Sequence, residues 1–476
     1  MRVFKQRKTS PSPGMEWLKS VNQLCSPRSF RLFGANRTLL SSSGTVKVVS
    51  ILALTRGVLA SDENKKVTLG HQPEINIGTL GHVDNGKSTI VQSLTGVWTA
   101  RHSEELRRGI TIRVGYADAS FYECPSCEPP SNYSTSKICP NCKSETKFLR
   151  SVSFVDCPGH HSLMVTMLSG AAIMDGALFV ISSNVKCPQA QDREHLLAAE
   201  MVGLQKLVVV QNKIDVVDRE RAKQNYFEIK EFTKGTVAGK APIIPVSAQH
   251  KLNMDVLIGA IQERIPTPKR DHVLSARMSI LRSFDVNRPG TEAEALTGGV
   301  VGGSVVQGVF RHGEDVEIRP GIKTEEANKI RYEPLMAKVE SLQAGGGEVK
   351  QAAPGGLIAM RTDLDPSVTK SDGLVGNVLG RVGTLPTSLD KVSLDVELFE
   401  KAVGTEQLVP VQKIKMNEPL VLNAGTAVTS GVVVSAREDL ADVVLKKPIC
   451  SDPGSKVALS RRIGESWRLI GFGTLR

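Results

Sequence analysis

The sequence lacks any long hydrophobic run. Its apolar stretches are a handful of residues long, and the one at residues 48–54 is interrupted by Ser50. A helix that crosses a bilayer needs about 20 consecutive apolar residues. We therefore expect no membrane span and no membrane partner. The length of 476 residues predicts a multi-domain protein in which each domain can bury its own core.

Acidic residues are scarce at the N-terminus. Residues 1–70 contain 12 Lys and Arg but three Asp and Glu, and Glu16 is the only acid before Asp62. This composition is similar to that of an organellar transit peptide. The interpretation that we favour is a disordered basic tail, or a start codon placed upstream of a true start such as Met15. We assign residues 1–72 to a basic extension outside the fold, expected to be disordered.

Charge is also nearly balanced over the rest of the chain. The net charge of the whole chain is +11, and residues 1–70 account for most of that excess. Any contact with nucleic acid must therefore come from local patches of positive charge.

The cysteines do not follow the dense pattern of a secreted disulfide framework. Of the eight, the scattered ones are Cys25, Cys157, Cys187 and Cys450. The others form two Cys-x-x-Cys pairs with eleven residues between them: Cys124, Cys127, Cys139 and Cys142. This usage favours the reducing cytoplasm. The two pairs predict one structural Zn²⁺ that holds an insert at residues 122–148, which is too small for a core of its own. Four free thiols are the alternative.

From residue 74, apolar strands alternate with helix-length segments. We expect the strands at residues 75–80, 152–156, 177–182, 206–211 and 243–246. This alternation predicts an α/β domain with a parallel sheet, at residues 73–268, which ends at two closely spaced prolines. Beyond it, short β-branched runs between Gly and Asp turns predict two β-barrel domains, at residues 269–383 and 384–476.

The most informative motif is the loop at residues 81–88, which reads Gly-His-Val-Asp-Asn-Gly-Lys-Ser. It matches G-x-x-x-x-G-K-[ST] between an expected strand and an expected helix. In such a loop, backbone N–H groups surround nucleotide phosphates, Lys87 reaches the β and γ phosphates, and the Ser88 hydroxyl binds Mg²⁺. The alternative is a glycine-rich turn that arose by chance. The predicted nucleotide contacts here are Asp84, Asn85, Gly86, Lys87, Ser88 and Thr89.

Three further segments at strand ends argue against chance and select guanine. After the second strand, the Asp156 carboxylate can hold a water of Mg²⁺, and the N–H of Gly159 can contact the γ-phosphate. The Asp215 carboxylate can accept the N1–H and 2-amino protons of guanine, a donor pair that adenine lacks. The segment at 247–249 can direct a backbone N–H at guanine O6, and the order of all segments fits one open sheet. The remaining predicted contacts with GTP or GDP are Asn212, Lys213, Ser247, Ala248 and Gln249.

Together these motifs resemble those of the translational GTPases, whose loop reads G-H-V-D-H-G-K-[ST] and whose second switch reads D-x-P-G-H. Thr111, in the first switch, is suited to bind Mg²⁺ through its hydroxyl. The resemblance implies Mg²⁺ binding by Ser88 and Thr111 and a second cation site at Asp84 and Gly109. It places His160 where the family positions the attacking water. Two residues depart from the family: Asn85 replaces the usual His, and His161 follows His160. Nucleotide binding should survive the first change, whereas its effect on hydrolysis stays open.

The cysteine insert between the two switches narrows the resemblance. It is similar to that of the gamma subunit of archaeal and eukaryotic translation initiation factor two, especially the archaeal form. Further stretches that fit this family lie at residues 102–106, 115–117, 167–172, 280–290 and 467–473. The resemblance implies a GTPase that carries methionylated initiator tRNA to the small ribosomal subunit, in a heterotrimer with alpha and beta subunits. It implies release of the tRNA after GTP hydrolysis.

Candidate contacts with tRNA are few. Tyr116 is suited to stack on adenine, and Arg277, Arg282 and Arg288 are suited to contact phosphates. Alternatively, Tyr116 belongs to the core and the arginines to a solvated face. Two rival functions also stay open. One is another tRNA-delivering GTPase, such as a selenocysteine-specific elongation factor, and the other is a scaffold that binds GTP but barely hydrolyses it.

Overall fold

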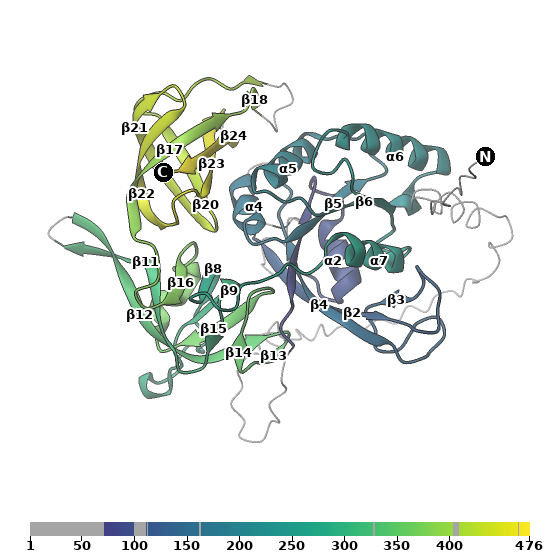
Figure 1. Ribbon diagram of the computed structural model, residues 1–476, viewed down its shortest axis with the longest axis horizontal. Coiled ribbons are helices and arrows are strands. Elements are labelled where there is room, and N and C mark those ends of the chain that lie inside the picture. The colour runs from purple at the N-terminus through teal and green to yellow at the C-terminus, as the bar shows by residue number, and fades with distance from the viewer. Residues whose placement is uncertain are drawn as a thin grey trace, which may run out of the picture. The chain divides into compact units, whose positions relative to one another are not determined.

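The computed structural model describes residues 71–99, 111, 113–160, 163–326, 329–402, 409–464 and 466–476 (Figure 1). These residues all belong to one compact unit, residues 61–476. Nearly all of the predicted basic extension lies outside the described residues, as do Gly109 and His161. None of the helices in the described part of the chain is both long and apolar enough to cross a membrane.

The first part of the described chain forms a seven-stranded sheet in the order β3-β2-β4-β1-β5-β6-β7. Its strands are β1 (Ile75–Leu80), β2 (Gly115–Glu123), β3 (Tyr133–Ser134), β4 (Lys147–Asp156), β5 (Gly176–Ser182), β6 (Leu207–Asn212) and β7 (Ile243–Pro245). The five neighbouring strands β4, β1, β5, β6 and β7 are parallel, as predicted. The edge differs from the prediction, because β2 and β3 add to β4 in antiparallel fashion. The chain reaches β4 from β2 through the cysteine insert and not through a crossover helix, so these neighbours run in opposite directions.

Helices cover both faces of this sheet (Figure 1). They are α2 (Lys87–Thr95), α4 (Met164–Ala171), α5 (Ala190–Met201), α6 (Arg219–Thr233) and α7 (Met254–Arg264), with a 3-10 turn η3 (Ile214–Val216) after β6. Alternate residues of β5 enter two separate cores: Phe179 packs with the cluster that includes α4 and α5, and Val180 packs with the cluster that includes α2 and α7. Burial on both faces explains why the central strands β5 and β6 are rich in apolar residues.

A six-stranded ring follows. Its strands are β8 (Arg277–Phe284), β9 (Val300–Gln307), β11 (Asp315–Glu326), β12 (Lys329–Ala344), β15 (Ile358–Thr362) and β16 (Val378–Arg381). The order is β11-β16-β8-β9-β15-β12, and pairing of β11 with β12 closes the ring around one apolar core. Short elements decorate it: η4 (Ala293–Ala295), β10 (Phe310–Arg311), β13 (Gly347–Glu348), β14 (Gln351–Ala352), α8 (Pro366–Thr369) and η5 (Lys370–Asp372).

A second barrel completes the chain. Its strands are β17 (Ser388–Leu398), β20 (Pro419–Ala424), β21 (Ala427–Arg437), β22 (Leu440–Cys450), β23 (Lys456–Ile463) and β24 (Ser466–Leu475), and it is closed in the order β17-β22-β21-β20-β23-β24. The short strands β18 (Lys401–Ala402) and β19 (Val409–Pro410) pair separately. Along β21, buried and exposed residues alternate, as expected for a strand with one face on a core. The predicted fold class, an α/β domain followed by two β-barrels, is therefore confirmed.

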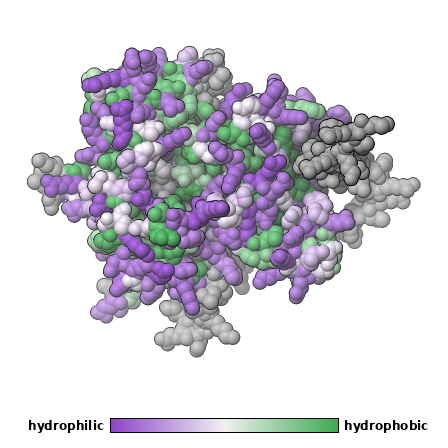
Figure 2. Space-filling model, viewed as in Figure 1, coloured by the Kyte–Doolittle hydropathy of each residue, from purple (hydrophilic) through white to green (hydrophobic). Residues whose placement is uncertain are grey.

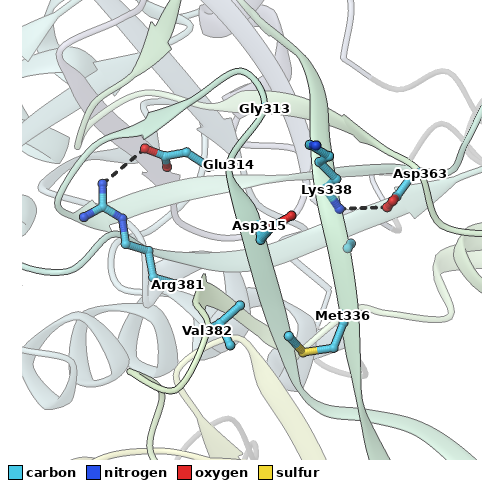
Figure 3. Close-up of a pocket in the computed structure, with 9 residues that line it drawn as sticks. Gly313, Glu314, Asp315, Met336, Lys338, Asp363, Arg381 and Val382 are labelled. Atoms are coloured by element: carbon cyan, nitrogen blue, oxygen red, sulfur yellow. Dashed lines mark hydrogen bonds and ion pairs between the residues drawn. The ribbon is translucent and has the colours of Figure 1, made fainter.

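Figure 2 shows a mainly hydrophilic face with separate apolar patches. One cavity, of about 750 Å³, lies in the first barrel beside β11 and β12 (Figure 3). There Arg381 pairs with Glu314 at 3.2 Å, and the Lys338 N–H donates to Asp363 at 2.7 Å. None of the residues that line this cavity belongs to the predicted nucleotide or cysteine sites.

Candidate functional site

The loop at residues 81–88, here called the phosphate loop, connects β1 to α2 at the carboxyl end of the parallel strands. Gly86 begins the helix in the left-handed region, with φ of +88°. A Cβ atom there would lie 2.4 Å from Nδ2 of Asn212, so both the backbone conformation and the space require glycine. The loop therefore has a defined curved shape that suits a phosphate group.

Lys87 is buried in the curve of the phosphate loop. Its ammonium donates to the carbonyl oxygens of Gly81 and His82, both at 2.9 Å. Burial lowers the pKa of Lys87, and the nearby Asp156 carboxylate opposes this effect. A Cβ on Gly159 would lie 2.2 Å from the Lys87 Nζ atom. The backbone of the second switch thus lies directly against the lysine that would hold the β and γ phosphates.

Two of the predicted Mg²⁺ ligands, Ser88 and Thr111, come together. The hydroxyl oxygens of Ser88 and Thr111 lie 3.0 Å apart. Asp156 is fully buried, and its two carboxylate oxygens accept hydrogen bonds from Thr79 at 2.9 Å and Thr99 at 2.5 Å. Two hydroxyls with a fixed carboxylate suit a hard cation that keeps several waters.

The second predicted cation site can be described only in part. Asp84 is exposed on the phosphate loop, with a positive φ of 65°. Its predicted companion Gly109 lies outside the described residues.

The predicted guanine-binding segments are joined to the phosphate loop through Asn212. Its Nδ2 donates to the Asn85 carbonyl at 2.9 Å, and its Oδ1 accepts from the Ala248 N–H at 3.2 Å. Asp215 lies in η3, with a carboxylate oxygen 3.6 Å from Nε2 of His250. The Lys213 carbonyl accepts a hydrogen bond from Ser183 at 2.7 Å. The Asn212 side chain thus joins the phosphate loop to the segment at 247–249 that we predict to contact guanine.

The other predicted residues of this site differ in exposure. Ser247 is buried and its backbone pairs with Leu252, whereas Gln249 is exposed. Thr89 is half-buried in the first turn of α2. His160, the last residue of the second-switch motif, is half-buried, and its carbonyl accepts from the Leu163 N–H at 2.9 Å.

Helix α5 contributes two residues that the sequence motifs do not reveal. His195 is buried, and its Nδ1 accepts from the Gly81 N–H at 2.9 Å. Burial lowers the pKa of His195, as do the nearby positive charges, so the ring is neutral and can accept. Asp192 accepts from the His82 N–H at 3.0 Å and from the Asn85 side chain at 3.2 Å. In the sequence, an Asp and a His within a helix look like ordinary polar residues, and no motif marks them.

The four cysteines of the insert converge. Their sulfur atoms all lie within 4.8 Å of one another. The Cys124 and Cys142 sulfurs are 3.4 Å apart, and those of Cys127 and Cys139 are 3.7 Å apart. Zn–S bonds of about 2.3 Å in a tetrahedron separate the sulfurs by about 3.8 Å. The donor set and its spacing therefore fit a tetrahedral Zn²⁺.

The predicted tRNA contacts are dispersed. Tyr116 is half-buried on β2. On β8, Arg282 donates to Asp372 at 2.9 Å, and Arg277 pairs with Asp452 of the second barrel. Arg288 is exposed in the loop after β8. Two of the three arginines thus already have acidic partners within the chain.

Comparison with known proteins defines the class. A family model described as the elongation factor Tu GTP binding domain matches residues 72–267, and one described as initiation factor eIF2 gamma, C terminal, matches residues 390–475. The chain is a GTP-binding protein of the translational GTPase class, as predicted.

Full-length relatives define the family. The translation initiation factor 2 subunit gamma of Archaeoglobus fulgidus is 58% identical over 404 residues, which cover 85% of this chain and 95% of that protein. Those of Methanocaldococcus jannaschii and Pyrococcus horikoshii are each 55% identical, over 85% of this chain and 98% of each protein. The chain belongs to the family of gamma subunits of translation initiation factor 2. It is therefore a GTP-binding subunit of a translation initiation factor.

Solved structures add information on the fold alone. A bacterial selenocysteine-specific elongation factor aligns with a TM-score of 0.63 at 22% identity, and the chain spans 58% of its length. The elongation factor SelB of Methanococcus maripaludis, in complex with a GTP analogue, aligns with a TM-score of 0.62 at 20% identity. Relatives at 55–58% identity carry the assignment to initiation factors.

Proposed function

We propose that this subunit carries methionylated initiator tRNA to the small ribosomal subunit while GTP is bound, and releases it after GTP is hydrolysed to GDP. The observation that carries the proposal is the approach of both switches to the phosphate loop. Thr111 of the first switch contacts Ser88, and Gly159 of the second lies against Lys87. A γ-phosphate between them would hold both segments, and its loss would release both.

A path from the first switch to the first barrel supports this coupling. Arg113 follows Thr111 by two residues and donates to Asp372 at 3.2 Å. The other carboxylate oxygen of Asp372 accepts from Arg282 on β8 at 2.9 Å. A nucleotide that fixes the position of Thr111 can therefore also affect, through Arg113 and Asp372, the barrel that holds three of the candidate tRNA contacts. Binding energy for tRNA then differs between the two nucleotide states, as any switch requires.

The residues have separate roles in this proposal. Guanine is bound by Asn212, Lys213, Asp215 and the segment at 247–249, and the phosphates by residues 84–89 with Gly159. Ser88 and Thr111 hold Mg²⁺, Asp156 acts through a bound water, and Asp84 with Gly109 would hold a second cation. His160 positions the attacking water. Mg²⁺ supplies positive charge to the phosphates, and Zn²⁺ on the four cysteines folds the insert.

The domain plan and partners extend the proposal. We place a GTPase domain at residues 73–268 with the zinc insert at 122–148, barrels at 269–383 and 384–476, and a basic extension before them. The partners are the alpha and beta subunits of the same factor and the small ribosomal subunit, in the cytoplasm.

Binding of labelled tRNA to the purified chain tests the function. We expect methionylated initiator tRNA to bind at least tenfold more tightly with a non-hydrolysable GTP analogue than with GDP, an effect of about 1.4 kcal/mol. Elongator tRNA serves as the matched control and should bind more weakly in both states. Equal affinity for initiator and elongator tRNA would instead indicate a general tRNA carrier.

A second candidate function is a GTP-gated scaffold with little hydrolysis. The observation behind this alternative is Asn85, which lies within the phosphate loop at the position where the family loop has His. Single-turnover hydrolysis with and without small ribosomal subunits separates the two. Stimulated turnover supports the carrier that releases its tRNA, and its absence supports the scaffold.

A further inference from the structure

The unusual residue of the phosphate loop has a specific partner. Asn85 is 2% exposed, and its side-chain amide donates to the Val180 carbonyl at 2.8 Å and to the Asp192 carboxylate at 3.2 Å. A neutral imidazole has a single N–H group, so the His found at this position in the resembled loop cannot donate to both acceptors. Asn85 and Asp192 thus form a pair that joins the loop to α5.

Asp192 receives three hydrogen bonds. One oxygen accepts from the His82 N–H at 3.0 Å and from Asn85, and the other accepts from the Gln189 N–H at 2.9 Å, where α5 begins. The residue is 1% exposed. A buried carboxylate is costly unless it is hydrogen-bonded, and two of its three donors belong to the phosphate loop. Its location is therefore coupled to the shape of the loop.

The same helix holds the loop at a second point. His195, one turn beyond Asp192, accepts from the Gly81 N–H. The N–H groups of Gly81 and His82 are consequently bound to α5 and cannot turn towards a phosphate without breaking buried hydrogen bonds. This arrangement sets which part of the loop is available to the nucleotide before the nucleotide arrives.

We propose that Asp192 is a positioning residue of the nucleotide site, which holds the phosphate loop through Asn85 and His82 and thereby slows nucleotide release. The inference rests on the proposed function, because it assumes that GDP and GTP bind at this loop. A loop held in its binding shape loses less conformational entropy when the nucleotide binds, and it must break these contacts to relax during release.

Release of a fluorescent GDP from the full-length chain, chased with unlabelled GDP, tests the proposal. We expect Asp192→Ala and Asn85→Ala each to accelerate release roughly tenfold, which corresponds to the loss of a buried hydrogen bond. Asp192→Asn keeps an acceptor oxygen for the loop and should remain within about threefold of the wild type. In the double variant the two effects should combine less than multiplicatively, because both changes remove the contact between Asn85 and Asp192.

Two variants on the same helix are matched controls. Gln189→Ala removes the reciprocal side-chain contact of the α5 capping box, and Glu200→Ala alters an exposed residue. Both should leave release within about twofold of the wild type. If Asp192→Ala does not fold, Asn85→Ala carries the test, because it leaves the cap of α5 intact.

Several results would overturn the inference. Unchanged release in Asn85→Ala, or effects that multiply in the double variant, would show that the pair does not act on the nucleotide. A wild-type chain that binds neither GDP nor GTP would refute the proposed function itself. If the wild-type chain binds GDP normally and release is unchanged in the variants, only the role of Asp192 is refuted.

Discussion

The phosphate loop and the cysteine insert are two local motifs that are held in different ways. The phosphate loop lies on a sheet with an apolar core on each face, and buried partners from α5 and β6 bind its backbone. The insert has few buried side chains; Ile138 between the cysteine pairs is 57% exposed. Four sulfur atoms within 4.8 Å of one another are its central contact.

The two regions therefore owe their stability to different sources. Protein contacts alone can hold the phosphate loop before a ligand binds, because its polar groups are paired and its flanking elements are packed. The insert has few buried side chains to offset the entropy of ordering its chain, so we expect its shape to depend on a metal bound by the four cysteines. Each of the following experiments changes one region and asks whether the other responds.

Removal of the metal should have the largest effect, and it should be confined to one region. We expect Cys124→Ser to abolish stoichiometric Zn²⁺ binding and to raise hydrogen exchange over residues 122–148 towards that of an unfolded chain. GTP affinity should change by less than about threefold, because a local folding unit can open without the rest of the domain. Mass spectrometry and metal analysis provide the measurements.

Cys450→Ser is the control for this change, since Cys450 is buried in β22 outside the cluster. It should retain one Zn²⁺ per chain. Loss of GTP binding in Cys124→Ser would show that the two regions depend on one another and would refute the comparison.

The converse experiment alters the ligand contact and leaves the fold intact. Asp215→Asn should weaken GTP binding about 100-fold, because it removes two charge-assisted hydrogen bonds to guanine. Xanthosine triphosphate, which carries a carbonyl in place of the 2-amino group, should recover much of the loss. The melting temperature of the nucleotide-free protein should not change.

His250→Ala is the matched control, because the His250 ring lies 3.6 Å from Asp215 and is exposed. We expect its GTP affinity to stay within about threefold of the wild type. A similar loss in both variants would indicate a general disturbance of this segment and no recognition of the base by Asp215.

The contact of the insert with the core of the α/β domain gives a smaller effect. Tyr133 of β3 packs against the core beside α7, where a Cβ on Gly259 would lie 3.0 Å from its ring. Tyr133→Ala should reduce the free energy of unfolding by about 1–2 kcal/mol and raise hydrogen exchange in β3 and α7. Zn²⁺ should remain bound. Ile138→Ala, at an exposed position, should stay within about 0.5 kcal/mol; equal losses in the two variants would argue against docking through Tyr133.

The smallest predicted effect concerns Glu194 on α5. Burial raises the pKa of this carboxyl to about 7, although Arg468 on β24 lies 3.3 Å away and opposes the shift. Between its unfolded pKa of about 4.3 and this value, the folded state binds more protons than the unfolded state. Stability from this group is therefore complete below that window and is lost as the pH rises through 7.

Glu194→Gln removes this titration. Its melting temperature relative to the wild type should rise by about 2–4 °C between pH 5 and pH 8. Glu200→Gln, on the exposed side of the same helix, should differ from the wild type in melting temperature by the same amount at pH 5 and at pH 8. A constant difference for Glu194→Gln as well would mean that its carboxyl does not titrate in this range.

The parts of the fold that could be predicted are those with a strong local signal. The parallel strands β5 and β6 are largely apolar because both faces of the sheet are covered, so their positions follow from the sequence. The edge strand β2 mixes buried and exposed residues, and β3 has only two residues. Neither gives a pattern that could be separated from a loop. The order of strands in the barrels depends on pairing between distant segments, which local periodicity does not encode.

By itself, the sequence determined the family and predicted the chemistry of the site. The spacing of glycine, lysine and serine in the phosphate loop, Asp215 and the four cysteines specify their ligands through residue type and short-range geometry. Only the tertiary structure decided how the loop is held. Asn85 and Asp192 are 107 residues apart, and their contact exists because α5 packs beside β1 and β5 with one particular face turned to the loop. Such a contact depends on the packing of whole elements, and no local pattern in either segment records it.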